Sequence, residues 1–102
     1  MSTRVIRYRT RPDRADENQK LVEAVFAELT ERQPAGVRYA CLRGPDGSFF
    51  HVVTLDDDDA PHPLLELASF GRFQAGVGER CAEQPVAVEV SVVGSYGLDI
   101  SS

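Results

Sequence analysis

The chain has 102 residues, of which 42% are hydrophobic and 26% charged, and its formal net charge at pH 7 is −5. This is the length of one domain and the composition of an ordinary globular protein rather than a disordered one. The acidic charge argues against nucleic acid as a partner, and no apolar run approaches the ~18 residues that span a bilayer. We therefore expect one cytoplasmic domain over residues 1–102 that contacts neither nucleic acid nor a membrane.

The amino terminus also favours the cytoplasm, a compartment in which cysteines stay reduced. The first residues lead into a short alternating segment, not into the hydrophobic region of a signal peptide. Cys41 and Cys81 lie far apart and form no CxxC motif. We expect both to be reduced and mostly buried thiols. A domain this small buries only about two-thirds of its unfolded surface, so it gains stability by oligomerising.

The first third of the chain predicts a strand followed by a helix. Residues 4–10 (RVIRYRT) alternate with period two and are rich in β-formers, which favours a strand. Asp13 or Asp16 can cap a helix that follows. The helix is indicated by apolar residues at the 3-4 spacing of one face, and residues 33–36 (QPAG) end it. These apolar residues are Leu21, Val22, Val25, Phe26 and Leu29.

The next segments predict a hairpin and a second helix. Residues 37–42 and 49–55 are strands, joined by a strong turn signal at residues 43–48 (RGPDGS). Pro63 suits the first position of a helix whose apolar stripe runs over residues 64–77. Three glycines in that stripe predict a helix that is irregular or ends early, with Pro85 closing it.

The last predicted element is a strand over residues 86–97 (VAVEVSVVGSYG), with valine at positions 86, 88, 90 and 92. The order β-α-β-β-α-β is that of the ferredoxin-like α+β fold, in which two helices pack on one face of a four-stranded antiparallel sheet. We assign the four valines to the helix-covered face. Alternation then predicts an open, uncovered face formed by Val5, Arg7, Arg9, Phe49, His51, Val53, Leu55, Glu89 and Ser91.

This predicted open face carries the functional hypotheses. This face is too apolar to remain exposed to solvent. A mostly apolar surface with a few polar groups is typical both of a dimer interface and of a small-molecule site. We expect a homodimer through this face. His51 is the candidate catalytic base, with Glu89 or an arginine fixing its tautomer, and a hydrogen-bonded buried histidine is the alternative. The candidate ligand-binding residues are Arg7, Arg9, Phe49, Val53, Leu55, Glu89 and Ser91.

The remaining polar residues predict no metal or nucleophilic site. Successive residues of an extended chain point to opposite sides, so Asp56 to Asp59 cannot all converge on one cation, and we expect a solvated strand end in which Asp56 accepts loop hydrogen bonds. His62 is expected to cap the following helix or to be exposed. Two histidines eleven residues apart lack a third metal ligand. Tyr8, Tyr39 and Tyr96 can each donate to a ligand, although packing is their usual role.

The element order, the segment FFHVVTLDD running into Asp56 and the helix start LASFGRF resemble the dimeric α/β-barrel superfamily. Within it, they are similar to the antibiotic-biosynthesis-monooxygenase-like domains. Ser69, Phe70 and Phe73 match the Ser-x-x-Phe-like start of that family's second helix. The resemblance implies two open sheets facing each other in a homodimeric barrel. It also implies cofactor-free oxidation of an aromatic or polyketide-like molecule, with no metal or flavin.

The chain departs from this family at positions that bear on activity. The glutamate and tryptophan often found near the end of the third strand correspond here to Val53 and Leu55. The histidine early in the second helix corresponds to Glu66, unless His62 takes its role. We therefore expect a non-catalytic dimer that is structural or binds a small organic molecule, its open face held by an internal ion-pair network. The alternative is a cofactor-independent monooxygenase in which an arginine stabilises a phenolate or carboxylate. The network and the alternative both draw on Arg7, Arg9, His51 and Glu89.

Overall fold

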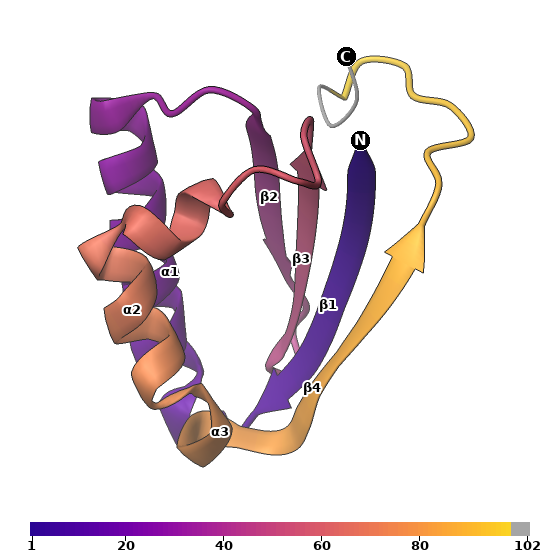
Figure 1. The fold of residues 1–102 in the computed structure, drawn as a ribbon. Helices are drawn as coiled ribbons and strands as arrows, with labels where there is room; N and C mark the ends of the chain where they lie inside the picture. The colour runs from indigo at the N-terminus through magenta and orange to yellow at the C-terminus, as the bar shows by residue number, and fades with distance from the viewer. Residues whose placement is uncertain (99–102) are drawn as a thin grey trace.

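The computed structural model describes residues 1–98, which form an antiparallel sheet and a layer of helices on one side of it (Figure 1). The elements in chain order are β1 (Ser2–Thr10), the 3-10 helix η1 (Pro12–Arg14), α1 (Ala15–Arg32), β2 (Val37–Arg43), β3 (Ser48–Leu55), the 3-10 helix η2 (Pro63–Glu66), α2 (Ala68–Ala75), α3 (Val77–Arg80) and β4 (Cys81–Val90). The strand order is β2-β3-β1-β4. The predicted ferredoxin-like α+β fold is thus confirmed.

The strand register reverses most of the predicted face assignment. Residues directly opposite each other on antiparallel strands share a face, and His51 lies opposite Ile6 on β1 and Cys41 on β2. His51, Phe49 and Val53 are buried under the helices, and Val86 and Val88 point to the uncovered face with about half of their surface exposed. Period two shows which residues of one strand share a face, but it does not show which face the helices cover.

The arginines of β1 lie on the side opposite His51. Arg7 pairs with Phe50 and Val86, and all three belong to the uncovered face. Arg9 lies on the same face and forms an ion pair with Glu83, 3.3 Å away. The expected network of Arg7, Arg9, His51 and Glu89 is therefore wrong, because the sheet separates the two arginines from the histidine.

Both predicted caps of the first helix are also wrong. The chain enters α1 through η1, which begins with Pro12, and no side chain caps the first turn of α1. Asp16 instead accepts from Arg43 at 3.1 Å. The helix ends at Arg32, and Gln33 caps it with a left-handed backbone (φ 47°) and an N–H that donates to the carbonyl of Leu29.

The second helical region is irregular, as its glycines predict. It is divided into η2, α2 and α3, with breaks at Leu67 and Gly76. Pro85 does not close it but lies inside β4, which is an edge strand and so tolerates a residue without an N–H. The strand ends at Val90, so the predicted strand over residues 86–97 is too long at its end and begins too late.

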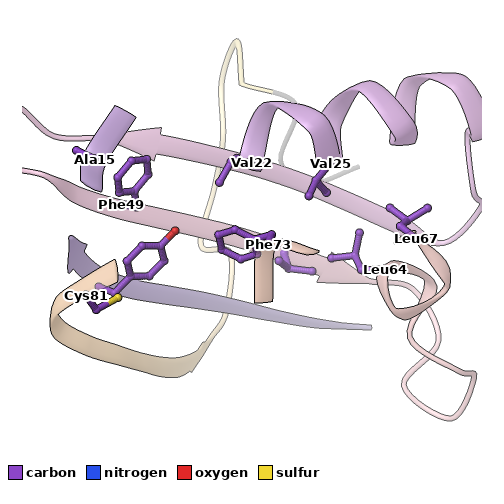
Figure 2. Close-up of a cluster of buried hydrophobic side chains, with 10 residues drawn as sticks. Ala15, Val22, Val25, Phe49, Leu64, Leu67, Phe73 and Cys81 are labelled. Atoms are coloured by element: carbon purple, nitrogen blue, oxygen red, sulfur yellow. The ribbon is translucent and has the colours of Figure 1, made fainter. Parts of the chain in front are cut away.

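The core lies between the sheet and the helices. Figure 2 shows Val22 and Val25 of α1 and Phe73 of α2 converging with Phe49 of β3 between the two layers. Phe49 and Val25 are each 1% exposed. Each fully buried side chain of this kind contributes about 1.5–3 kcal/mol to folding. The apolar stripe of α1 therefore anchors it over the centre of the sheet.

Among residues 1–98, no helix is long and apolar enough to cross a membrane.

Candidate functional site

A cavity of about 560 Å³ lies between the sheet and the second helical region. The sheet contributes Tyr8, Tyr39, His51 and Val53 to its wall, and α2 contributes Phe70 and Phe73. This volume is within the usual range of small-molecule sites, and so is the mixture of an apolar wall with a few polar groups. The cavity lies within one chain, between the layers, and not on the uncovered face where the sequence placed the site.

The cavity opens beside β4. Pro85, Ala87 and Glu89 line it from this strand and are exposed, whereas His51 and Val53 line it from β3 and are buried. The helices cover the centre of the sheet but leave its β4 edge free. A ligand can therefore enter past β4 and reach the wall formed by β3.

The predicted site residues divide into three groups. The cavity wall includes His51, Val53, Leu55 and Glu89. Phe49 lies under it, with its ring stacked on that of Tyr8 at 5.5 Å. The others lie elsewhere: Arg7 and Arg9 on the uncovered face, and Ser91 one residue beyond the end of β4.

His51 lies at the centre of the cavity wall between two tyrosine hydroxyls. Its Nε2 is 2.8 Å from the hydroxyl of Tyr8, and its Nδ1 is hydrogen-bonded to the hydroxyl of Tyr39. Its ring also packs on Phe73, with the centroids 5.4 Å apart. The sequence suggested that Glu89 or an arginine fixes the tautomer of His51. In the structure the hydrogen-bond partners of both ring nitrogens are tyrosine hydroxyls instead.

Burial determines the protonation state of His51 and of the tyrosines and the cysteine around it. Burial lowers the pKa of His51 to about 4, so the ring is neutral at pH 7. Burial likewise raises the pKa of both Tyr8 and Tyr39 above the ordinary value of a phenol. Cys41 Sγ lies 3.7 Å from Nε2 of His51, and burial raises the pKa of this thiol to about 11. The cluster therefore consists of neutral donors and acceptors at neutral pH.

Two residues that the sequence analysis missed complete the cluster. Asn18 of α1 donates from Nδ2 to the hydroxyl of Tyr8 at 2.8 Å, and Arg80 at the end of α3 donates from Nε to Oδ1 of Asn18 at 2.9 Å. They are 0% and 2% exposed. The sequence signal for Asn18 is its position on the apolar stripe of the helix, three residues after Ala15 and four before Val22. Arg80 has no such signal, because helix breaks determine where it points.

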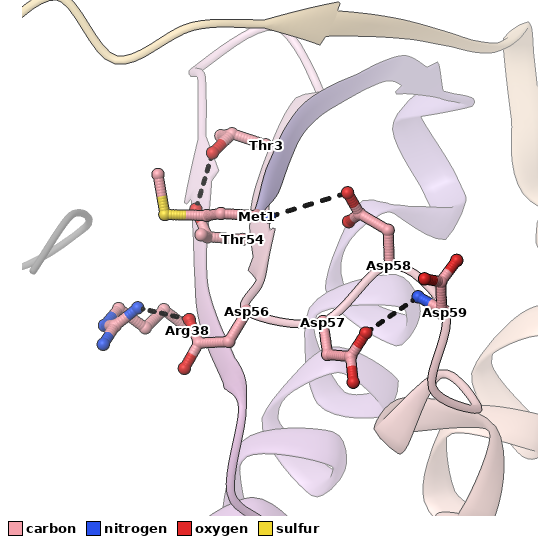
Figure 3. Close-up of polar contacts among 8 residues, drawn as sticks. All are labelled: Met1, Thr3, Arg38, Thr54, Asp56, Asp57, Asp58 and Asp59. Carbon is pink, nitrogen blue, oxygen red and sulfur yellow. Dashed lines mark hydrogen bonds and ion pairs between the residues drawn. The ribbon is translucent and has the colours of Figure 1, made fainter.

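The four consecutive aspartates are exposed, and the side chains of Asp56, Asp57 and Asp58 each have a different partner (Figure 3). Asp56 forms an ion pair with Arg38 at 3.0 Å, and Asp58 lies 3.6 Å from the amino terminus. Asp57, not Asp56 as expected, accepts a loop N–H, from Asp59 at 3.0 Å. They form a solvated strand end, and within residues 1–98 no cluster of three or more His, Cys, Asp or Glu side chains could hold a metal ion.

His62 caps a helix start, as the sequence predicts. Its Nδ1 accepts the N–H of Leu64 at 3.2 Å, and Pro63 occupies the first position of η2. Burial and the nearby Arg4 both lower its pKa. It lies at the rim of the cavity, with Phe70 stacked on it at 6.4 Å. Its ring therefore has a structural partner of its own.

Solved structures of other proteins share this fold. A Caulobacter crescentus CB15 protein, provisionally named an antibiotic biosynthesis monooxygenase, superposes with a TM-score of 0.73 at 21% identity, over 91% of this chain and 90% of its own. Similarly named proteins from Nitrosomonas europaea and Bacteriodes thetaiotaomicron VPI-5482 give 0.75 at 13% identity and 0.77 at 12% identity. They cover 92% and 95% of this chain and 100% and 92% of their own.

No model of a known family matches the sequence, and no curated protein matches it. The likeness is therefore one of structure: this chain has the fold of the proteins named antibiotic biosynthesis monooxygenases, as its resemblance to that group implies.

Proposed function

We propose that this protein is a one-domain homodimer that binds a small, mostly aromatic organic molecule in the cavity of each protomer. The main support for the proposal is the cavity of about 560 Å³, whose wall combines His51 and two tyrosines with apolar side chains and has further polar residues at its rim. A purely structural dimer has no need of such a space, because well-packed cores leave few voids larger than a water molecule. Its two free cysteines favour a reducing compartment, in keeping with the cytoplasmic location that we propose.

The ligand chemistry follows from the wall. Phe70, Phe73 and Val53 offer flat apolar contact, which suits an aromatic or polyketide-like ring system. Arg4 and Glu89 lie opposite each other on β1 and β4 at the open side of the cavity. They can contact a polar group of the ligand that remains near water.

The homodimer would use the uncovered face of the sheet. This face holds Leu42, Val86 and Val88, which are 57%, 54% and 53% exposed. Val5 and Val52 lie opposite each other in the middle of the same face. Neighbouring apolar side chains exposed to water mark an interaction surface, and a second copy of the same face would cover them by twofold symmetry.

Cofactor-free oxidation of the ligand is the alternative function, with His51 as the base. It requires the ring to take a proton from the ligand. A pKa lowered to about 4 by burial makes His51 a weak base, and both of its nitrogens are already bonded to tyrosine hydroxyls. These two features favour binding over catalysis by His51.

The ligand proposal is tested by titrating the ¹⁵N-labelled protein with tetralin, an apolar bicyclic probe. We expect the largest amide shifts in β3 and α2, around Val53 and Phe73, because both line the cavity. Shifts confined to the uncovered face, around Val52 and Val88, or no shifts at all would contradict it.

The alternative is tested by oxygen uptake with an anthrone. Uptake that is lost in His51→Ala and kept in His62→Ala would favour the oxidase. Absence of uptake in the wild-type protein, or equal uptake in all three proteins, would exclude His51 as its base.

A further inference from the structure

A continuous line of buried hydrogen bonds connects Arg80 to the cavity. It runs from Arg80 to Asn18, then to the hydroxyl of Tyr8, to the imidazole of His51 and to the hydroxyl of Tyr39. The first four residues are at most 3% exposed. Tyr39 and His51 both line the cavity, so the line ends in its wall. The five residues come from five elements, namely α3, α1, β1, β3 and β2.

The chemistry of arginine fixes the direction of the first two bonds. A guanidinium only donates, so the oxygen of the Asn18 amide must face Arg80. The amide nitrogen of Asn18 then faces Tyr8 and can only donate to its hydroxyl oxygen. No other assignment of the amide satisfies both contacts. Arg80 also donates to the carbonyl of Phe73 at 2.6 Å, which holds the guanidinium in place.

The donor and acceptor in the next two bonds are determined by the acceptor that is available to the hydroxyl proton of Tyr8. The oxygen of Tyr8 already accepts from Asn18, and within residues 1–98 its one close acceptor is Nε2 of His51, at 2.8 Å. A buried hydroxyl without an acceptor is unfavourable, so Tyr8 donates to Nε2. The ring is neutral at pH 7 and therefore carries its one proton on Nδ1, which donates to the oxygen of Tyr39.

We infer that this line holds His51 as the Nδ1–H tautomer and thereby presents the hydroxyl proton of Tyr39 to the cavity, where it binds an acceptor oxygen of the ligand. Among residues 1–98 the hydroxyl of Tyr39 has His51 as its hydrogen-bond partner, and toward His51 it only accepts. Its own proton is thus left for a ligand. The ligand class is a ring system with a carbonyl, enolate or phenolate oxygen at the end that contacts Tyr39. This assignment rests on the proposed binding of a ligand in the cavity.

The positive charge of Arg80 favours this direction of the hydrogen bonds, in which each group donates toward Tyr39. Among the described residues no carboxylate lies within ion-pair distance of Arg80, and its partners are neutral oxygens and the ring of Phe73, 5.6 Å away. All four bonds of the line donate in the direction from this cation toward Tyr39. Hydrogen bonds aligned in series polarise one another, so the Tyr39 hydroxyl becomes a better donor. Tyr39 is thus the specificity-determining residue, and Asn18 positions it through Tyr8 and His51.

An almost isosteric substitution of Asn18 reverses the donor and acceptor in the other three bonds of the line, from position 18 to Tyr39. In Asn18→Asp the carboxylate still accepts from Arg80 but has no proton to donate, so Tyr8 must donate to it. The oxygen of Tyr8 then accepts from Nε2–H of His51, and Nδ1 accepts the proton of Tyr39. The hydroxyl of Tyr39 no longer donates to the cavity. A merely structural role for Asn18 predicts no such exchange of tautomers.

The first measurement is the tautomer of His51, read from two-bond ¹H–¹⁵N correlations of the imidazole rings at pH 7. We expect Nδ1–H in the wild-type protein and Nε2–H in Asn18→Asp. His62 serves as an internal reference, because its Nδ1 accepts from Leu64 and its proton is therefore on Nε2 whenever the ring is neutral. Nε2–H at His51 in the wild-type protein would overturn the inference, whether or not the variant folds.

The second measurement compares the affinity of two matched probes, 1-tetralone and tetralin, which differ by one carbonyl oxygen. We expect the affinity ratio of tetralone to tetralin to fall about tenfold in Tyr39→Phe and in Asn18→Asp, with tetralin binding kept. An unchanged ratio in Tyr39→Phe, with both probes still bound, would overturn the inference and leave the proposed ligand site standing. If neither probe binds the wild-type protein, the proposed function fails, and with it the role of Tyr39 as a ligand donor. The tautomer measurement would still decide the direction of the line.

Discussion

Arg80 and Asn18, 62 residues apart in the chain, are joined by a hydrogen bond of 2.9 Å that connects the end of α3 to the start of α1. This bond gives a buried guanidinium a partner and orders the amide that contacts Tyr8. It therefore links the irregular helical region to the sheet at the base of the cavity. The local stability of that region depends on a charged side chain in a place where an apolar one is usual.

Replacing this guanidinium by an apolar group of similar length should destabilise the protein. Arg80→Met leaves the oxygen of Asn18 and the carbonyl of Phe73 without donors, and each loss costs about 1–3 kcal/mol. Removing a buried charge offsets part of this cost, so we expect a net loss of roughly 2 kcal/mol in urea unfolding. Arg72→Met, which removes an exposed cation from α2, should change the stability by less than about 0.5 kcal/mol. If Arg80→Met is as stable as the wild type, the free-energy cost of burying the guanidinium equals the stability that its hydrogen bonds contribute.

The buried His51 should make stability depend on pH below neutrality. Its pKa is about 4 in the folded protein, against an ordinary value of 6.5. Between these values the unfolded chain binds a proton that the folded protein does not, so stability is full above pH 6.5 and falls as the pH is lowered toward 4. We expect a loss of roughly 2 kcal/mol between pH 7 and pH 5, measured by urea unfolding.

Two variants separate His51 from the other titrating groups. His51→Gln should remove most of this loss, whatever its stability at pH 7. His62→Gln should keep most of it, because His62 is only partly buried and its lowered pKa contributes in the same direction but less. A pH dependence of stability that is the same in His51→Gln as in the wild type would assign the effect to the carboxylates instead.

The proposed dimer can be tested by placing a charge at Val88. This residue is 53% exposed on the uncovered face, where it lies on the edge strand β4 opposite Val5. In a dimer through that face, Val88→Asp buries an unpaired charge, so the variant should sediment as a monomer where the wild type sediments as a dimer at micromolar concentration. Leu65→Asp is the matched control, because Leu65 is a similarly exposed apolar residue (69%) but lies on η2 in the helical region. It should remain a dimer. A monomeric wild type would contradict the proposal.

The sequence predicted the fold because its signals are local. Alternation in β1 and β3, the apolar stripe of α1 and the turn at residues 43–48 each follow from neighbouring residues. The topology then follows from the order of elements. The resemblance to the antibiotic-biosynthesis-monooxygenase-like domains was likewise confirmed at the level of the fold.

The site could be predicted only in part, because it depends on contacts between distant segments. The sequence marks His51 as a polar residue in an apolar strand, but only the register shows that it shares a face with Ile6 and not with Arg7. Its partner Tyr8 lies 43 residues earlier in the chain, and Asn18, which contacts Tyr8, comes from a third element. Nothing in the spacing of these residues connects them. Valine-rich β4 was assigned to the covered face on hydrophobicity, although its position at the edge leaves both of its faces exposed.

The position of the cavity mouth beside β4 can be tested by narrowing it. Ala87 is exposed and lines the cavity from β4, so Ala87→Phe should place a ring across the entrance without entering the core. We expect stability to change by less than about 0.5 kcal/mol, while the affinity for tetralin falls about tenfold or more, as measured by amide titration. Ala75→Phe adds the same ring at an exposed position of α2 away from the cavity wall and should bind as the wild type does. If Ala87→Phe binds tetralin as tightly as Ala75→Phe does, the ligand enters elsewhere, for example past the loop that carries Asp58 and Ala60, which is also exposed and lines the cavity.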